Sequence, residues 1–248
     1  MKNVILLYHD VVNDGGFESS GFPGSDAAVY KIEVKKFRQH LDAILRANPA
    51  VTLTFDDGGV SSHTYIADEL EKRGWKGYFF ITTNWIGQPG FLDANHIRDL
   101  RNRGHIIGTH SCSHPARISR YTLGDIIHEW SRSSAILADI VGKPIQSGSV
   151  PGGYYSEKVA RAAALAGLET LFTSEPTVQE NLVEGCIVRG RFMIQRHTSA
   201  KTAAALARGA AFSQFRQSAS WTVKKLCKAA GGRAWLKFRK RFFDLKYS

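Results

Sequence analysis

The chain changes from apolar to acidic within VTLTFDDGG, residues 51–59. Its first five residues are β-branched, leucine or aromatic, which is typical of a buried strand. Asp56 and Asp57 follow directly, where that strand should end. Two adjacent carboxylates repel each other, so this arrangement favours a site in which a positive charge offsets the repulsion or one carboxylate has a chemical task.

Similar short apolar runs alternate with longer helical patterns along the chain. The predicted strands are residues 4–8, 51–55, 77–81, 105–109, 148–150, 169–173 and 186–195, and the predicted helices are near 33–46, 63–73, 94–103, 123–141 and 156–166. Gly74, Gly104 and Gly167 stand where helices should end in left-handed caps. This repetition predicts an α/β fold with parallel strands, closed or nearly closed into a barrel, and a site on the rim at the carboxyl ends of the strands.

The length of 248 residues and the hydrophobic content of 43% allow one sizeable core. We expect a catalytic domain at residues 1–198 and a helical, basic C-terminal extension at residues 199–248. Cys112, Cys186 and Cys227 are widely spaced, which favours free thiols in a reducing compartment. The apolar run near the N-terminus is too short for a signal peptide or a membrane span, so a cytoplasmic location is expected.

The net charge of +11 is unevenly distributed. Residues 224–248 hold nine Lys or Arg and one acid, whereas residues 1–223 hold 24 basic and 21 acidic residues. The charge therefore predicts a local contact with an anionic surface and argues against a nucleic-acid-binding role.

The segment 221–248 is also rich in aromatic residues. A helix here would place aromatic and apolar side chains on one face with basic residues between them, as in helices that lie on an anionic membrane surface. Packing of the same face on the barrel is one alternative, and contact with a nucleic acid or an acidic glycan is the other. The residues of that face are Trp235, Phe238, Phe242 and Leu245.

A second polar cluster, THSCSHP at residues 109–115, follows the predicted strand 105–109. His110 and His114 are four positions apart, and a helical turn between them would point both imidazoles in one direction. Two imidazoles and a carboxylate are a common ligand set for a divalent metal. An Asp pair alone often caps a helix, and a His pair alone is often structural, but both together on neighbouring rim loops favour a metal site.

TFDDG and GHIIGTHSCSHP, in this order and spacing, resemble the motifs of the polysaccharide deacetylase family, also called the NodB homology family or the fourth carbohydrate esterase family. The resemblance covers roughly residues 1–198. It implies a distorted (β/α)7-type barrel and one divalent metal ion, zinc first, with cobalt, nickel or manganese as alternatives. It further implies that Asp56 is the general base and that Asp57, His110 and His114 hold the metal.

The resemblance leaves two candidates for the general acid that protonates the leaving amine. Most of the family uses a histidine in a late motif, and His197 in FMIQRHTSA lacks the usual pattern of leucine, any residue, histidine. LLYHDVV instead resembles the subgroup that deacetylates poly-N-acetylglucosamine, in which the histidine of an N-terminal YH motif is the acid. This resemblance favours His9 over His197.

The segment SVPGGYY, which begins at Ser149, departs from the family's third motif of Arg, any residue, Pro, an aromatic residue and Gly. Pro151 and Gly153 match, whereas Ser149 stands at the arginine position and Gly152 at the aromatic one. Without that arginine, another group must orient the base, or activity is reduced or redirected. We expect Pro151, Gly152, Gly153 and Tyr154 to bind substrate, with a simple turn as the alternative.

The sequence and the resemblance together predict a metal-dependent amidohydrolase. It would remove N-acetyl or N-formyl groups from amino sugars of an envelope polysaccharide, such as an exopolysaccharide or an O-antigen, in polymeric or lipid-linked form at the cytoplasmic side of the membrane. One alternative is an O-acetyl esterase or small-molecule amidase on the same fold. The other is a glycan-binding pseudoenzyme, motivated by Ser149 and by the incomplete late motif.

Overall fold

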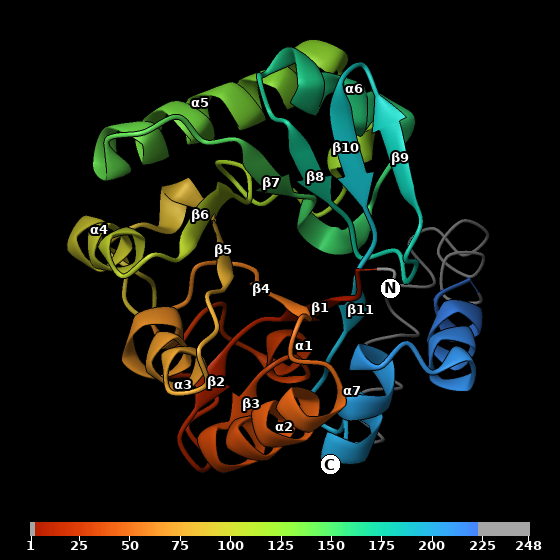
Figure 1. Ribbon diagram of the computed structural model, residues 1–248. Coiled ribbons are helices and arrows are strands. Elements are labelled where there is room, and N and C mark those ends of the chain that lie inside the picture. The colour runs from red at the N-terminus through yellow and green to blue at the C-terminus, as the bar shows by residue number, and fades with distance from the viewer. Residues whose placement is uncertain (1–2, 223–248) are drawn as a thin grey trace.

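A computed structural model describes residues 3–222, in which helices surround one curled, mostly parallel sheet (Figure 1). The strand order is β11-β1-β4-β5-β6-β7-β8-β10-β9, and β10 with β9 is its antiparallel pair. A separate small sheet joins β2 (Val11–Val12) to β3 (Ile32–Glu33). The strands of the main sheet are β1 (Ile5–Tyr8), β4 (Thr52–Phe55), β5 (Tyr78–Ile81), β6 (Ile106–Thr109), β7 (Ser147–Ser149), β8 (Thr170–Phe172), β9 (Glu180–Val183), β10 (Cys186–Arg189) and β11 (Phe192–Met193).

The sheet forms an incomplete barrel. The α/β class and the parallel, barrel-like sheet are confirmed, and β11 pairs with β1, so the first and last strands are neighbours as expected. The strands do not close the barrel completely, because β9 and β11 are the two edges of the sheet, although only Gly190 and Arg191 separate β10 from β11.

Helices cover the outer surface of the sheet (Figure 1). α5 and α6 lie on the half of the sheet that contains β7 and β8, and α2 and α7 lie on the half that contains β1. The α-helices are α1 (Ser25–Ala28), α2 (Val34–Ala47), α3 (Ala67–Glu71), α4 (Ala94–Asn102), α5 (Leu123–Val141), α6 (Glu157–Leu165) and α7 (Ala200–Ala207). Shorter helical turns are η1 (Ser62–Ile66), η2 (Thr83–Trp85), η3 (Ile118–Arg120) and η4 (Pro151–Gly153).

The boundaries of α5 show how the sequence sets a helix. The Thr122 side chain accepts a hydrogen bond from the Asp125 N–H at the N-terminus, and Gly142 ends the helix with φ 68°. The predicted range 123–141 is therefore confirmed. The glycines predicted as left-handed caps, Gly74, Gly104 and Gly167, have φ values of 75°, 89° and 85°.

The run 186–195, predicted as one strand, is instead β10 and β11 separated by Gly190 and Arg191. A Cβ atom at residue 190 would overlap the carbonyl oxygen of Glu175, so the chain can make this close approach only with glycine. The bend carries the Arg191 side chain into the interior, where it is fully buried. Its guanidinium lies 5.6 Å from the centre of the Phe80 ring and 5.9 Å from that of Phe172.

The beginning of the C-terminal extension packs on the body of the protein. Ala203 and Leu206 of α7 are buried, and Asn48 Nδ2 at the end of α2 donates a 2.8 Å hydrogen bond to the Ala207 carbonyl. Residues 211–222 are also helical. The aromatic face predicted at Trp235, Phe238, Phe242 and Leu245 lies outside the described residues. Among residues 3–222, none of the helices combines the length and the apolar character needed to cross a bilayer.

Candidate active site

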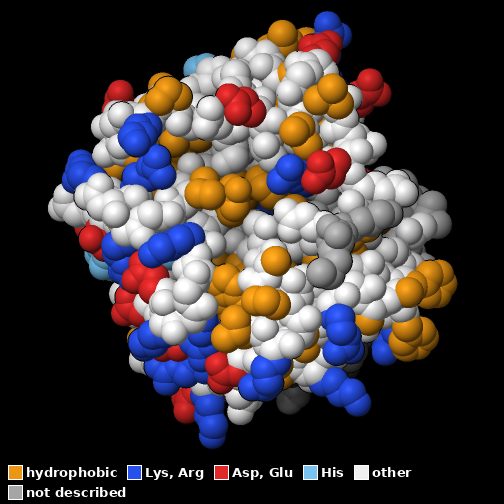
Figure 2. All heavy atoms as spheres, viewed as in Figure 1, with side chains coloured by type: hydrophobic (Ala, Val, Ile, Leu, Met, Phe, Trp, Pro, Cys, Tyr) orange, Lys and Arg blue, Asp and Glu red, His pale blue; other side chains and the backbone are white. Residues whose placement is uncertain are grey.

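The polar residues singled out in the sequence meet at one rim of the open barrel. His9 follows β1, the Asp pair follows β4, His110 follows β6, and Ser149 ends β7. Carboxyl ends of parallel strands share one edge of a sheet, which explains this convergence. The rim opens into a groove of about 750 Å³. Figure 2 shows hydrophobic side chains gathered in the middle of this view, between the half that carries α5 and α6 and the half that carries α1 and α2.

Asp57, His110 and His114 form a compact ligand set. One ligand atom from each lies within 4.8 Å of the others, and Asp57 Oδ1 is 3.4 Å from Nε2 of both histidines. Asp57 Oδ1 is buried and has no hydrogen-bond partner among residues 3–222. Burial alone would raise the pKa of this carboxyl, but the two imidazoles and the charge of His9 hold it well below its usual value. An unpaired, ionised oxygen facing two imidazole nitrogens fits a divalent metal site.

The orientation of the His110 ring is fixed by a contact of the nitrogen that points away from Asp57. Its Nδ1 lies 2.8 Å from the backbone carbonyl oxygen of Ser149. A carbonyl can only accept, so Nδ1 carries a proton and Nε2 is the ring nitrogen that faces Asp57. His110 is also 2% exposed, so this ring orientation is held within a packed environment.

The segment between the two histidines is not helical, and the expectation of a helical turn is wrong. Ser111 and His114 have φ values of 67° and 53°, in the left-handed region that non-glycine residues rarely occupy. The two imidazoles nevertheless converge, with ring centres 5.0 Å apart. The loop reaches this conformation because its backbone is bonded to side chains around it instead of to its own turns.

Glu129 of α5 supplies the main support for this loop. Its Oε2 accepts hydrogen bonds of 2.9 Å from the backbone N–H groups of Cys112 and Ser113, and its Oε1 accepts one of 2.7 Å from the Ser113 hydroxyl. The Ser111 hydroxyl also accepts a 3.1 Å bond from the His114 N–H. These bonds compensate the strained backbone and fix the spacing of the two histidines.

Asp56 is held by an arginine that sequence reasoning missed. Arg191 donates from Nη1 to Oδ1 at 2.8 Å and from Nη2 to Oδ2 at 2.9 Å, and Ser149 Oγ donates to Oδ2 at 2.9 Å. Burial would raise the pKa of Asp56, but Arg191 and His110 lower it below its ordinary value. Asp56 is therefore a fixed carboxylate at neutral pH, with one of about four lone-pair positions left for an incoming proton.

The comparisons with known proteins agree with this geometry. Residues 46–171, just over half of the chain, match the family model described as polysaccharide deacetylase. The chain belongs to the polysaccharide deacetylase family. Similar curated proteins include the peptidoglycan-N-acetylmuramic acid deacetylase PdaA of Bacillus subtilis, 31% identical over 126 residues, which are 50% of this chain and 46% of PdaA. A chitin deacetylase of Arthroderma benhamiae is 32% identical over 119 residues, 47% of this chain and 31% of that protein.

The chain thus spans less than half the length of these relatives. Among solved structures, BC0361, a polysaccharide deacetylase from Bacillus cereus, has a TM-score of 0.69 at 17% identity and covers 84% of this chain and 69% of its own. IcaB from Ammonifex degensii has a TM-score of 0.67 at 20% identity, covering 84% of this chain and 97% of its own. At these identities the likeness shows that this deacetylase-family chain shares their fold.

The other predicted residues of the family site occupy different positions relative to the groove. His9 lines it, and its buried Nδ1 has no hydrogen-bond partner among the described residues. Gly152, Gly153 and Tyr154 also line the groove, whereas Pro151 is buried beneath them as the first residue of η4.

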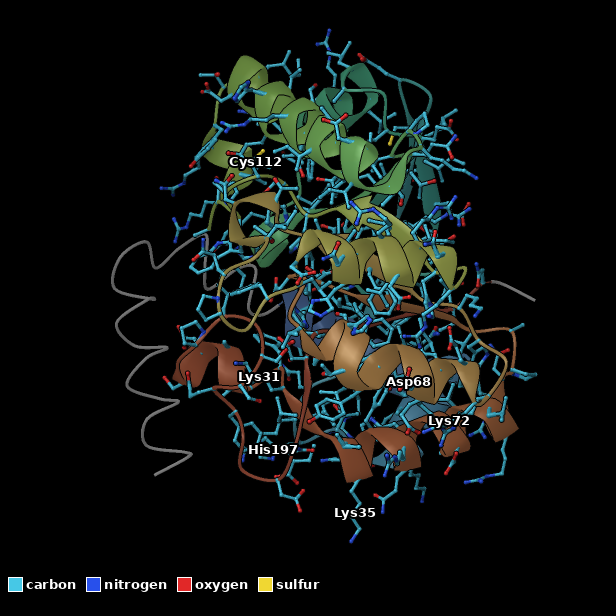
Figure 3. All side chains as sticks on the ribbon, turned by 90° about the vertical axis from the view of Figure 1, so that its left-hand side faces the viewer. Lys31, Lys35, Asp68, Lys72, Cys112 and His197 are labelled. Atoms are coloured by element: carbon cyan, nitrogen blue, oxygen red, sulfur yellow. The ribbon has the colours of Figure 1, made fainter. Side chains whose placement is uncertain are left out.

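His197, the alternative general acid, and Cys112, which stands between the two histidines in sequence, both lie apart from the ligand set. Cys112 is buried in the loop between the two histidines and lies outside the ligand set of Asp57, His110 and His114. Figure 3 shows His197 in the opposite half of the molecule from Cys112, and His197 does not line the groove. The geometry thus brings His9, and not His197, to the groove that Asp57, His110 and His114 also line.

The sequence holds only a weak signal for Arg191. It stands inside the apolar run CIVRGRFMIQ, but Arg189 in the same run would share its face of a strand and is partly exposed, so the run does not show which arginine is buried. In this member of the family, Arg191 supplies the contact that the third motif would supply from position 149. The Asp56 carboxylate is therefore oriented by Arg191 although position 149 carries serine.

Proposed function

We propose that this protein is a metal-dependent deacylase that hydrolyses N-acetyl or N-formyl groups of amino sugars in an envelope polysaccharide. The observation that carries the proposal is the pairing of an Arg191-bound carboxylate, Asp56, with the adjacent ligand set of Asp57, His110 and His114 in one groove. Family membership supports the reaction class.

The roles of the residues follow from their contacts. Asp57, His110 and His114 would hold one divalent ion, for which zinc suits two nitrogen ligands and one oxygen ligand. Such an ion supplies Lewis-acid polarisation of the acyl carbonyl and an acidified water. Asp56 stands beside this set, with His110 Nε2 3.9 Å from its Oδ2, and accepts the proton of the attacking water.

The leaving amine needs a proton, and we assign this role to His9. The ring lines the groove 4.7 Å from the ring of Tyr30, and it lies close enough to Asp56 and Asp57 to lower the pKa of both carboxyls. This assignment supports a relation to the subgroup with an N-terminal YH motif. Arg191 also weakens the argument for a pseudoenzyme, because the base keeps an arginine partner despite Ser149.

The substrate is proposed to be an exopolysaccharide or O-antigen precursor met at the inner face of the membrane. Trp221, the first residue of the predicted membrane segment 221–248, lines the groove. This position supports a substrate that reaches the site from a surface contacted by that segment. Residues 223–248 lie outside the described residues, and the cytoplasmic location stays a prediction.

The proposal is tested by release of acetate from an N-acetylated chitooligosaccharide and of formate from its N-formyl counterpart, after the protein has been loaded with zinc. Activity should be lost in Asp56→Asn and in His114→Ala. Retention of wild-type hydrolysis by Asp56→Asn would refute the assignment of the base. Hydrolysis of O-acetyl but not N-acyl substrates would identify the protein as the esterase alternative.

A further inference from the structure

One wall of the groove carries two arginines that the proposed reaction does not use. Both follow His114 in the chain: Arg117 directly precedes η3, and Arg120 is its last residue. Both line the groove. Arg117 is three residues beyond His114, so their Cα atoms are at most about 11 Å apart. A guanidinium here can reach a group on a sugar adjacent to the one whose acyl group faces the ligand set.

Neither guanidinium has a carboxylate partner among residues 3–222, whereas Arg73, Arg103 and Arg191 are each ion paired. Arg117 Nη2 is moreover buried without a hydrogen-bond partner in the described part of the chain. A buried charged donor left unpaired is unfavourable, because it has lost its contact with water and gained no acceptor in exchange. An incoming acceptor that pairs with Nη2 would remove that cost.

Arg117 is held in place before any ligand arrives. Its guanidinium lies over the Tyr154 ring, 5.3 Å from the ring centre. The loop of Tyr154 packs closely on the residue before Arg117, since a Cβ atom at Gly152 would come within 2.8 Å of the Ala116 carbonyl oxygen. A cation fixed in this way loses little side-chain entropy on binding an anion.

The carboxylates of the groove do not neutralise this wall. Asp56 is bound by Arg191, and Asp57 faces the two imidazoles. Asp26 lies on α1 and Glu175 lies between β8 and β9, and among the described residues neither forms an ion pair with Arg117 or Arg120. The wall formed by Arg117 and Arg120 is therefore locally cationic.

We propose that Arg117 and Arg120 form a subsite for an anionic group of the glycan, a carboxylate or a phosphate, close to the N-acylated sugar. The inference rests on the proposed function only in taking the groove as the glycan site. It specifies the substrate class as an acidic glycan, either a polymer with uronate or other acid-bearing sugars or a glycan that ends in a phosphate.

The subsite can be tested by binding alone, with sugars that carry no N-acyl group and cannot be hydrolysed. Titration calorimetry on the zinc-loaded protein would compare cellotetraose, the same tetramer with alternate residues oxidised to glucuronate, and cellotetraose 1-phosphate. We expect the wild type to bind at least one anionic tetramer roughly tenfold more tightly than the neutral one at low salt. The preference should shrink in 0.5 M NaCl, where the Debye length is only a few ångströms.

The test variant is the double substitution Arg117→Gln/Arg120→Gln, and its matched control is Arg98→Gln. Arg98 is exposed on α4, and among the described side chains its guanidinium hydrogen bonds only to that of Asn95. The double variant should lose the preference for the anion while keeping its affinity for cellotetraose, and the control should keep both. A stronger effect of the phosphate assigns the subsite to phosphate, and a stronger effect of glucuronate assigns it to an acidic polymer. Equal binding of all three sugars by the wild type, or a preference that survives in the double variant, would overturn the subsite.

Failure of the anionic subsite and failure of the proposed function would give different experimental results. Absence of deacylation with every N-acyl substrate would refute the enzyme, but it would not change the ratio of the binding constants. Conversely, a protein that releases acetate from chitooligosaccharides yet binds neutral and anionic tetramers equally would retain its function and lose the subsite.

Discussion

Arg191 binds both carboxylate oxygens of Asp56, at 2.8 and 2.9 Å, although the two residues are 135 positions apart in the chain. Both are almost completely buried, at 0% and 4% exposure, and Ser149 donates to the same carboxylate. Buried ion pairs of this kind are most informative when one partner is removed, because the other charge is then left unpaired.

Arg191→Met should therefore reduce both stability and activity. Loss of the guanidinium leaves the Asp56 carboxylate buried without its cation, which costs about 3–5 kcal/mol in such pairs. The Asp56 pKa would also rise, so the base would be less ionised. Urea denaturation and the rate of acetate release measure the two effects. Arg189→Met is the matched control, since Arg189 pairs with Glu180 at the sheet edge, and a loss of equal size there would contradict the special role of Arg191.

Removal of the metal should lower the stability of the wild-type protein, but it should have little effect on variants that lack one of the proposed metal ligands. We expect zinc to raise the melting temperature of the wild-type protein and a chelator to reverse this rise, because a ligand that binds only the folded state stabilises it. His114→Ala and Asp57→Asn should show little response to zinc, as measured by differential scanning fluorimetry and by metal content after dialysis. An undiminished shift in both variants would show that zinc binds elsewhere.

Glu129→Gln should weaken metal binding without unfolding the protein. The amide keeps its size but holds the two backbone N–H groups and the Ser113 hydroxyl less strongly than the carboxylate does. Residues that orient metal ligands in this way typically change affinity by about 10–100-fold. Competition with a chromogenic chelator gives the zinc affinity. Asp139→Asn, an exposed residue on the same helix, should leave it unchanged.

The identity of the general acid can be read from the leaving group. His9→Gln should slow hydrolysis of an N-acetyl sugar by roughly 10²–10⁴-fold, because an amine leaves poorly without a proton. The same variant should hydrolyse 4-nitrophenyl acetate at nearly the wild-type rate, since nitrophenolate leaves unaided. His197→Gln, a change outside the groove, should affect neither substrate. Equal losses on both substrates in His9→Gln would instead indicate a role in binding.

Acid should destabilise the fold through a buried histidine far from the chemistry. Burial lowers the pKa of His40 from 6.5 to about 4, although its bond to the Thr198 carbonyl opposes the shift. Between these pH values the unfolded chain binds a proton that the folded chain does not, so the free energy of unfolding falls as the pH drops from 6.5 to 4. The loss from this residue is roughly 3 kcal/mol.

His40→Gln should flatten this part of the stability curve, measured by urea denaturation at a series of pH values. His128, which is exposed on α5, provides the control, and His128→Gln should keep the wild-type slope. An unchanged slope in His40→Gln would assign the acid sensitivity to other groups.

Much of the fold, and the convergence of Asp57, His110 and His114, could be predicted because the determining signals are local. The strand before Asp56, the range of α5 and the glycine caps depend on neighbours in sequence, and each pattern has one structural solution. The loop at residues 111–114 was misjudged because its conformation depends on Glu129, which belongs to the following helix. Arg191 was missed because its contact with Asp56 joins segments that are distant in sequence, and no residue near position 191 indicates that Asp56 is its partner.

Arg191 also bears on how members of this family are sorted into active and inactive proteins. A scan that requires arginine at the position of Ser149 would discard this chain, although the cation that such a rule looks for stands beside the base in space. Sequences with serine there and a charged residue in the bend before the last strand should be grouped together. The two positions have to be considered together, because the Ser149 and Arg191 side chains contact the Asp56 carboxylate at the same time.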